Sequence, residues 1–136
     1  MTKALNRRCF FLDAEKHAAS LSAVLSIDVN DLKQWNDGHG HAKGDDAICT
    51  LVHCVQKVIP KACYLYRTGG DEFMILCFNK EKETVEQLLM DIRRELAPTP
   101  YSCAIGMAYR DRDQEFNQLC LQADSEMYED KRKYHS

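Results

Sequence analysis

Apolar residues occur along the chain in two patterns, and each pattern predicts one type of secondary structure. In four segments they are spaced three and four residues apart, which places them on one face of an α-helix. These segments predict helices over about residues 6–19, 46–59, 81–96 and 114–132. Four shorter, mostly apolar runs end abruptly in polar residues, glycine or proline, as buried strands do. They predict strands over residues 21–29, 62–67, 72–78 and 101–109.

The order of the predicted elements indicates the fold class. Between the first and the last helix the order is βαββαβ, which is typical of a ferredoxin-like α+β palm with an antiparallel central sheet flanked by helices. A chain of 136 residues is long enough for one hydrophobic core and too short for two, so we expect a single domain over residues 1–136. In this topology the first strand lies beside the third and runs opposite to it. The end of the first strand therefore meets the turn that joins the second and third strands.

Three acidic residues converge at this meeting point. Asp28 lies near the end of the first strand, while Asp71 and Glu72 lie at the tip of the hairpin, in the stretch RTGGDEF at 67–73. Two ionised carboxylates about 4 Å apart repel each other by roughly 4 kcal/mol at an effective dielectric constant of about 20. A bound proton, a basic side chain or a divalent cation must therefore offset the repulsion.

The residues around these acids favour a metal-bound nucleotide. Ligand sets made only of oxygen favour Mg²⁺ or Mn²⁺, and Mg²⁺ held by one or two carboxylates usually completes its shell with phosphate oxygens. Gly69 and Gly70 lack Cβ atoms, so a ligand can approach the backbone of the turn closely. The connection after Asp28 offers backbone amides to phosphates at the start of a helix. Lys33 and Arg67 are the nearest cations in the sequence.

Each of these motifs also has a purely structural interpretation. Asp28 could cap a short helix that begins near Asp31, and the TGGD segment could be only a turn. Asp45 could be the N-cap of the helix at 46–59, and Lys131 could simply favour the dipole at the end of the last helix. The convergence of the acids is what favours a ligand site over these alternatives.

Composition excludes several classes of partner. The net charge of −3 argues against the broad basic face that a nucleic-acid backbone requires, so we expect no nucleic-acid partner. No apolar run approaches the roughly 20 residues of a membrane span, so we expect no membrane contact by this segment. We expect a cytoplasmic location, with any membrane anchor elsewhere in the parent protein. The seven cysteines lack a CxxC spacing and are expected to be reduced core residues.

Four blocks of the sequence carry a resemblance to a known family. They are NRRCF (6–10), DVNDLKQWNDGHGHAKGDD (28–46), RTGGDEF (67–73) and ADSEMYEDK (123–131). In order and in separation they resemble the blocks of the GGDEF family, diguanylate cyclases that condense two GTP molecules into cyclic di-GMP. The resemblance covers essentially the whole chain.

The resemblance implies a role for each matching position. The implied ligands of Mg²⁺ or Mn²⁺ are Asp28, the backbone carbonyl of Val29, Asp71 and Glu72. Among these, the implied catalytic residues are Asp28, Asp71 and Glu72, with Glu72 binding a second metal or helping to deprotonate the attacking 3′ hydroxyl. The guanine-reading pair is Asn36 and Asp45, because a carboxylate acceptor suits the N1 and N2 donors of guanine. The remaining implied substrate contacts are Lys33, Lys131, the backbone amides around Asp31 and Leu32, and the turn glycines Gly69 and Gly70.

The sequence also departs from the family pattern. Asn30 and Leu32 stand where the DxDxFK block has Asp and Phe. The tail KRKYHS lacks the common GRN ending, and Arg132 and His135 are the candidates to replace its phosphate contact. Many members carry an RxxD pair five residues before the signature, which binds product and inhibits the enzyme. Here that stretch is PKAC, Pro60–Cys63, so we expect no inhibition through this surface.

These observations support the hypothesis of a diguanylate cyclase domain that produces a bacterial second messenger for signal transduction. One domain holds one GTP, so we expect an active two-fold homodimer whose partners each contribute half of the site. The family block usually begins with DxLT, of which only the end is present here, so we expect an upstream sensory or dimerisation domain in a larger multidomain protein. The alternative is a catalytically silent GTP-binding or protein-interaction GGDEF domain. A palm-type polymerase is disfavoured by the size and the acidic balance of the chain.

Overall fold

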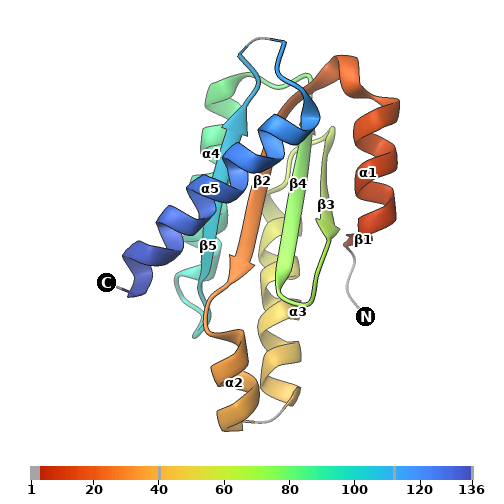
Figure 1. Cartoon of the computed structure of the whole chain (residues 1–136). Helices are drawn as coiled ribbons and strands as arrows, with labels where there is room; N and C mark the ends of the chain where they lie inside the picture. The colour runs from red at the N-terminus through yellow and green to blue at the C-terminus, as the bar shows by residue number, and fades with distance from the viewer. Residues whose placement is uncertain (1–3, 40, 112, 136) are drawn as a thin grey trace.

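A five-stranded sheet forms the centre of the computed structural model, which describes residues 4–39, 41–111 and 113–135 (Figure 1). The strands are β1 (Leu5–Asn6), β2 (Leu21–Val29), β3 (Cys63–Arg67), β4 (Glu72–Phe78) and β5 (Cys103–Tyr109). Their order across the sheet is β1-β3-β4-β2-β5. The short β1 runs parallel to β3, and the other neighbouring strands are antiparallel, so the sheet is mixed.

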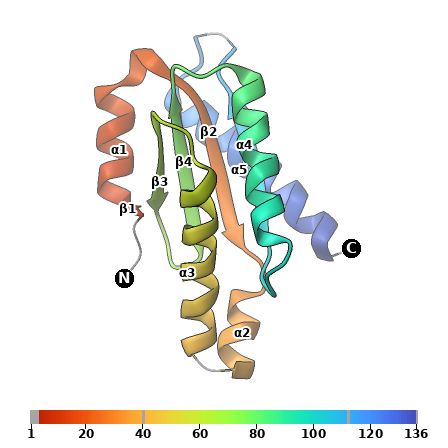
Figure 2. The same cartoon turned by 180° about the vertical axis from the view of Figure 1, so that it is seen from behind.

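Helices cover both faces of the sheet. They are α1 (Arg7–Lys16), α2 (Leu32–His39), α3 (His41–Val58), α4 (Lys82–Leu96) and α5 (Phe116–His135), with a short 3₁₀ turn η1 (Ala18–Ser20). Helices α1 and α5 lie on the face that Figure 1 shows, and α3 and α4 lie on the opposite face, seen in Figure 2. Helix α2 projects below the sheet and packs against the first half of α3. Among the described helices, none is long and apolar enough to cross a membrane.

The predicted βαββαβ core is confirmed, with one additional strand and with several boundaries shifted, most of all those of α1 and α3. Strand β1 was not predicted, because two residues are too few to show an alternation; it is defined by its pairing with Tyr66 and Arg67. Helix α1 ends at Lys16, where η1 follows after one residue. Helix α3 begins at His41, so Asp45 lies inside it and the N-cap interpretation of Asp45 is wrong. Packing against α2 offsets the weak helix preference of Gly44 and the two aspartates that follow it.

Alternate residues of β2 face two separate hydrophobic cores. Leu25 and Ile27 belong to the core beneath α3 and α4, whereas Val24 belongs to the core beneath α1 and α5. Since side chains alternate along a strand, the buried Ser26 and Asp28 lie on the α1 and α5 face with Val24. The alternation of β2 therefore directs Asp28 toward α5, on the face opposite α3 and α4.

Helix α5 lies directly against β5 because a glycine permits the contact. A Cβ atom added to Gly106 would lie 2.2 Å from the carbonyl oxygen of Ala123 and 2.2 Å from the amide nitrogen of Met127. No side chain can be accommodated at that distance without moving the helix. Gly106 thus allows the short distance between α5 and the sheet. That distance in turn sets the positions of the side chains that α5 extends toward β2.

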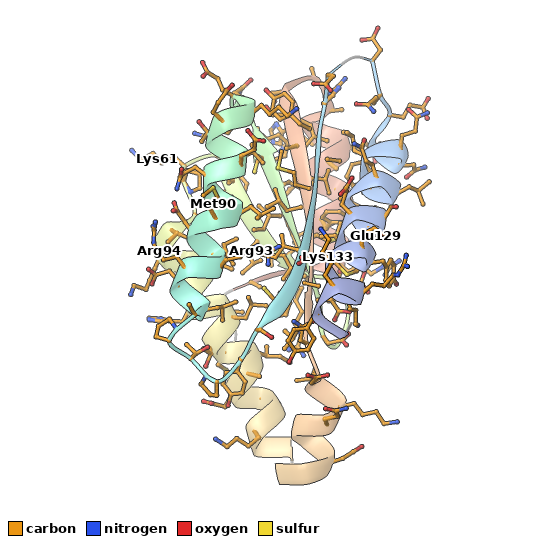
Figure 3. The ribbon with its side chains drawn as sticks, turned by 90° about the vertical axis from the view of Figure 1, so that its left-hand side faces the viewer. Lys61, Met90, Arg93, Arg94, Glu129 and Lys133 are labelled. Carbon is orange, nitrogen blue, oxygen red and sulfur yellow. The ribbon has the colours of Figure 1, made fainter. Side chains whose placement is uncertain are left out.

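An ion pair closes the outer edge of β5. Arg93 of α4 lies 2.8 Å from Asp130 of α5, and the same Asp130 oxygen accepts the backbone N–H of Ile105 at 2.9 Å. Figure 3 looks onto this edge, with Arg93 on one side of β5 and Glu129 and Lys133 of α5 on the other. The ion pair links a helix on one face of the sheet to a helix on the other. Asp130 also accepts one backbone N–H of the edge strand β5, and unpaired N–H groups on an edge strand can pair with another chain.

Candidate active site

The register of the sheet brings the predicted acids together. Asp28 of β2 is paired directly with Glu72 of β4, and directly paired residues place their Cβ atoms about 4.5–5.5 Å apart on one face. The amide of Val29 donates to the backbone carbonyl of Asp71 at 3.1 Å, which ties the tip of the hairpin to the end of β2. The predicted convergence of Asp28, Asp71 and Glu72 is confirmed.

Arg67 shapes the turn that carries these acids. Its Nε donates to the carbonyl of Gly69 at 3.2 Å, and its terminal nitrogen donates to the carbonyl of Gly70 at 2.7 Å. The guanidinium also lies 5.9 Å from the centre of the Phe73 ring. These contacts direct Arg67 toward backbone carbonyls of the turn, so its described role is to fix the loop rather than to bridge the carboxylates.

The two glycines of the turn serve different purposes. A Cβ atom at Gly69 would lie 3.2 Å from the Cβ atom of Glu72, which is tighter than an ordinary contact. At Gly70 nothing lies within 4 Å of the added atom, so this side of the turn is open. Neither glycine has a left-handed backbone, so the turn geometry alone does not require them. Gly69 allows close approach to Glu72, and Gly70 leaves the backbone accessible.

Lys131 supplies the cation of the site. Its Nζ lies 2.6 Å from Oδ2 of Asp28, and the Asp28 residue is only 8% exposed. Asp28 therefore contacts α5 and does not act as the cap of α2. The local sequence around Asp28 gives no sign of this partner, since Lys131 follows 103 residues later. The ADSEMYEDK block is the signal through which the resemblance identified it.

Burial and mutual repulsion shift the ionisation of the site. Burial raises the pKa of Asp28 above its ordinary value, Lys131 opposes that rise, and the neighbouring Asp71 adds to it. Burial also raises the pKa of Glu72, and the carboxylates of Asp124, Asp28 and Asp71 raise it further. The bond to Asp28 in turn raises the pKa of Lys131. One lysine thus lies among several acids, so the negative charge of the site exceeds its positive charge.

The donor set suits a divalent cation that arrives with its own ligands. The Oδ1 atom of Asp28 is buried and has no hydrogen-bond partner within the described residues, which is costly unless something binds it. No group of three or more His, Cys, Asp or Glu side chains in the described part of the chain is close enough to hold a metal ion by itself. Mg²⁺ typically takes only one or two carboxylates and fills its shell with water and phosphate oxygens. The residues present fit such an ion.

The predicted phosphate loop follows β2 directly. Asn30 is buried, and its amide and side-chain nitrogens donate to the carbonyl and the hydroxyl of Ser102, each at 2.9 Å. Asp31 has a left-handed backbone with φ of 58°. Helix α2 then begins at Leu32, as expected, with Lys33 exposed in its first turn. The first N–H groups of a helix lack partners within it and favour anions.

The structure places the remaining predicted residues on neighbouring elements. Asp45 is exposed on α3, and α3 packs against α2, which carries Asn36. The side chains of Asn36 and His135 lie outside the described residues. Arg132 forms an ion pair with Glu129 of its own helix at 2.8 Å.

Two features of the site were not predicted from the sequence. Asp124 of α5 accepts a hydrogen bond from the hydroxyl of Ser26 at 2.6 Å, and its negative charge raises the pKa of Glu72. A cavity of about 420 Å³ adjoins Glu72 on the α1 and α5 face. It is lined by Arg7, Phe10, Phe11, Thr68, Glu72, Met74, Asn117, Cys120, Leu121 and Asp124. Asp124 lies within the ADSEMYEDK block, which was the available signal.

Comparison with characterised proteins gives a consistent result. Residues 1–136 match the family model described as diguanylate cyclase, GGDEF domain. A diguanylate cyclase of Vibrio cholerae serotype O1 is 31% identical over 147 aligned residues, covering 97% of this chain and 46% of that protein. Diguanylate cyclase DgcM of Escherichia coli K12 is 29% identical over 140 residues, covering 94% of this chain and 34% of that protein. The chain thus spans less than half the length of these relatives.

Solved structures show the same fold. The GGDEF domain of DgcB from Caulobacter crescentus, in complex with c-di-GMP, superposes with a TM-score of 0.87 at 23% identity, covering 97% of this chain and 88% of that chain. The active GGEEF domain of a diguanylate cyclase from Vibrio cholerae has a TM-score of 0.82 at 28% identity, covering 96% and 93%. With the family model spanning every residue and the curated relatives nearly all of them, this chain belongs to the family of diguanylate cyclase GGDEF domains.

Proposed function

We propose that this domain is catalytically active and condenses two GTP molecules into cyclic di-GMP and two pyrophosphates. The observation that supports it most is the juxtaposition of Asp28 with Glu72 across two strands, with Lys131 bonded to Asp28. The buried Asp28 carboxylate has one oxygen without a hydrogen-bond partner in the described residues and lies beside a second acid, which is costly unless that oxygen binds something. The names of the relatives point to the same reaction.

Each acid then has a distinct role. Asp28, the carbonyl of Val29 and Asp71 would hold Mg²⁺ or Mn²⁺, and Glu72 would bind a second metal or accept the proton of the attacking 3′ hydroxyl. When bound, the metal supplies charge neutralisation at the α-phosphate and lowers the cost of deprotonating the hydroxyl. Partial burial keeps Glu72 more basic than an ordinary glutamate, which suits a proton acceptor.

The rest of the nucleotide would lie along the start of α2. Lys33, Lys131 and the amides around Asp31 and Leu32 would contact the phosphates, beside the open turn at Gly69 and Gly70. Asn36 and Asp45 would read the guanine edge, since a carboxylate accepts from both N1–H and N2–H. Adenine presents no such pair of donors. The packing of α2 against α3 supports this assignment by holding both residues on adjacent helices.

The reaction requires two domains. In each half-reaction the 3′ oxygen of one nucleotide forms a bond to the α-phosphorus of the other, the bond from that phosphorus to pyrophosphate breaks, and the hydroxyl proton leaves to a base. One domain holds one GTP, so two copies must face each other in a two-fold dimer. We propose that neighbouring domains of the parent protein bring them together, in line with the greater length of the relatives.

The test is direct incubation with GTP and Mg²⁺. Chromatography should show one cyclic di-GMP formed for every two GTP consumed, together with two pyrophosphates, at a rate that rises more than linearly with protein concentration below the dimer dissociation constant. Tight GTP binding without product, even when two copies are joined through a dimerising fusion, would support the silent-module alternative and overturn the proposed activity.

A further inference from the structure

The last turns of α5 contact the loop after β2 at two points. Lys131 bonds to Asp28, and the hydroxyl of Tyr134 donates to Oδ2 of Asp31 at 2.8 Å. Residues three apart lie on the same side of a helix, so both side chains reach one loop from one helical face. The C-terminal end of α5 thus contacts the segment that joins β2 to α2, which Figure 1 shows below and to the right of that end.

Asp31 has the least favourable backbone conformation in this loop and therefore depends most on contacts that stabilise it. Its φ of 58° is in the left-handed region, which costs a residue other than glycine about 1 kcal/mol and persists only where the surroundings fix it. On the side of β2 the loop is anchored by the two bonds from Asn30 to Ser102. Tyr134 supplies a hydrogen bond to the Asp31 carboxylate from the opposite element.

The backbone conformation of Asp31 sets the residue at which α2 begins and the direction of the helix axis. Leu32 and Lys33 follow at once, and the free N–H groups of the first helical turn take their direction from the preceding residue. A loop that samples other conformations at Asp31 would present these groups to a phosphate only part of the time. Its apparent affinity would fall by the fraction of time spent in the wrong conformation.

We propose that Tyr134 is a positioning residue for nucleotide binding, acting through Asp31 to fix the phosphate-binding loop in its competent conformation. The inference rests on the proposed function of that loop. Tyr134 belongs to the tail KRKYHS, where the sequence lacks the common GRN ending, so the contact is a feature of this chain. It also makes nucleotide affinity sensitive to the order of the last turn of α5.

Tyr134→Phe is the variant that tests the contact, because it removes only the hydroxyl. Tyr64→Phe is the matched control, since it removes a hydroxyl from an exposed tyrosine on β3, away from the loop. We expect Tyr134→Phe to raise the dissociation constant of GTP in Mg²⁺ by about 3- to 10-fold, the range for one half-exposed bond to a charged group. In turnover the KM should rise while kcat stays near the wild-type value.

A second readout needs no nucleotide. The amide of Asn30 is bonded to Ser102, so its hydrogen exchange, followed by NMR, reports how firmly the loop is held. We expect faster exchange at Asn30 in Tyr134→Phe than in the wild type or in Tyr64→Phe. If wild-type protein fails to bind GTP, the proposed function fails, but the exchange rate at Asn30 still decides whether Tyr134 holds the loop.

A double-mutant comparison decides whether Tyr134 acts through Asp31. Asp31→Ala should weaken GTP binding, and adding Tyr134→Phe to it should have no further effect, since the partner is already absent. Fully additive losses would overturn the proposed route through Asp31. Exchange and GTP affinity in Tyr134→Phe equal to those of the wild type would overturn the proposal as a whole.

Discussion

Nζ of Lys131 lies 2.6 Å from Oδ2 of Asp28, although the two residues are 103 positions apart in the sequence. The pair joins the last helix to β2, an inner strand of the sheet, and places a positive charge beside the most buried acid of the site. It neutralises one carboxylate and leaves Asp71 and Glu72 without an equivalent partner in the described contacts. The residual negative charge is what makes the site suited to a divalent cation.

The first prediction concerns nucleotide selectivity. GTP should raise the melting temperature in the presence of Mg²⁺ or Mn²⁺, and ATP should raise it much less, because the proposed contact of Asp45 uses donors that guanine presents and adenine does not. Thermal unfolding at equal nucleotide concentrations measures the difference. Asp45→Ala should abolish the preference without unfolding the domain, since Asp45 is exposed on α3. Equal stabilisation by ATP and GTP in the wild type would remove the guanine assignment.

A pair of glycine variants separates stability from ligand approach. Gly106→Ala should destabilise the fold by about 2–4 kcal/mol, because its Cβ atom would meet the backbone of α5 at 2.2 Å. Gly70→Ala should leave the melting temperature nearly unchanged, because nothing lies within 4 Å of the added atom. It should nevertheless weaken GTP binding, since the methyl group occupies the open side of the turn. Strong destabilisation by Gly70→Ala would contradict the described turn.

The shifted pKa of Glu72 predicts how the metal-free protein responds to pH. An acid whose pKa is raised by folding contributes stability that is present below its unfolded pKa and is lost as the pH rises through the folded value. At pH 7 the ionised Glu72 should therefore destabilise the metal-free fold. Glu72→Gln in chelator should raise the melting temperature by roughly 1–3 °C at pH 7, with the gain disappearing near pH 4. A loss of stability at pH 7 would contradict this sign.

The sequence predicted the βαββαβ core and the acid cluster because both depend on short-range patterns. A short apolar run placed Asp28 near the end of a strand, the hairpin signature placed Glu72 at the start of another, and the βαββαβ topology placed these two strands side by side. Lys131, Asp124 and Tyr134 reach the site only through the packing of α5 on β5, which depends on the contact at Gly106. No local pattern reports such a contact. The start of α3 was missed for a related reason, since its first turns contain Gly44 and no regular apolar spacing and are packed against α2.

We also predict that cyclic di-GMP does not bind tightly at the surface around Pro60–Cys63. The neighbouring cavity of about 320 Å³ is lined by Val58, Pro60, Glu83, Thr84, Gln87, Leu88 and Asp91. The carboxylates of Glu83 and Asp91 repel phosphate. Arg94, which Figure 3 shows on α4, forms an ion pair with Asp91 at 2.7 Å. Calorimetric titration measures the binding. Low-micromolar affinity that survives Asp71→Asn but is lost in Lys61→Ala would refute the prediction.

Turnover of GTP by the converged acids is tested by comparing the wild type with Glu72→Gln. The rate of cyclic di-GMP formation is measured at matched protein concentrations, with GTP affinity measured in parallel by calorimetry. We predict that Glu72→Gln keeps GTP affinity within about 10-fold, because Asp28 and Asp71 remain, while its rate falls by at least about 100-fold. Asp71→Asn, by contrast, should weaken metal-dependent binding itself. Near-wild-type turnover by Glu72→Gln would contradict the catalytic role proposed for this acid.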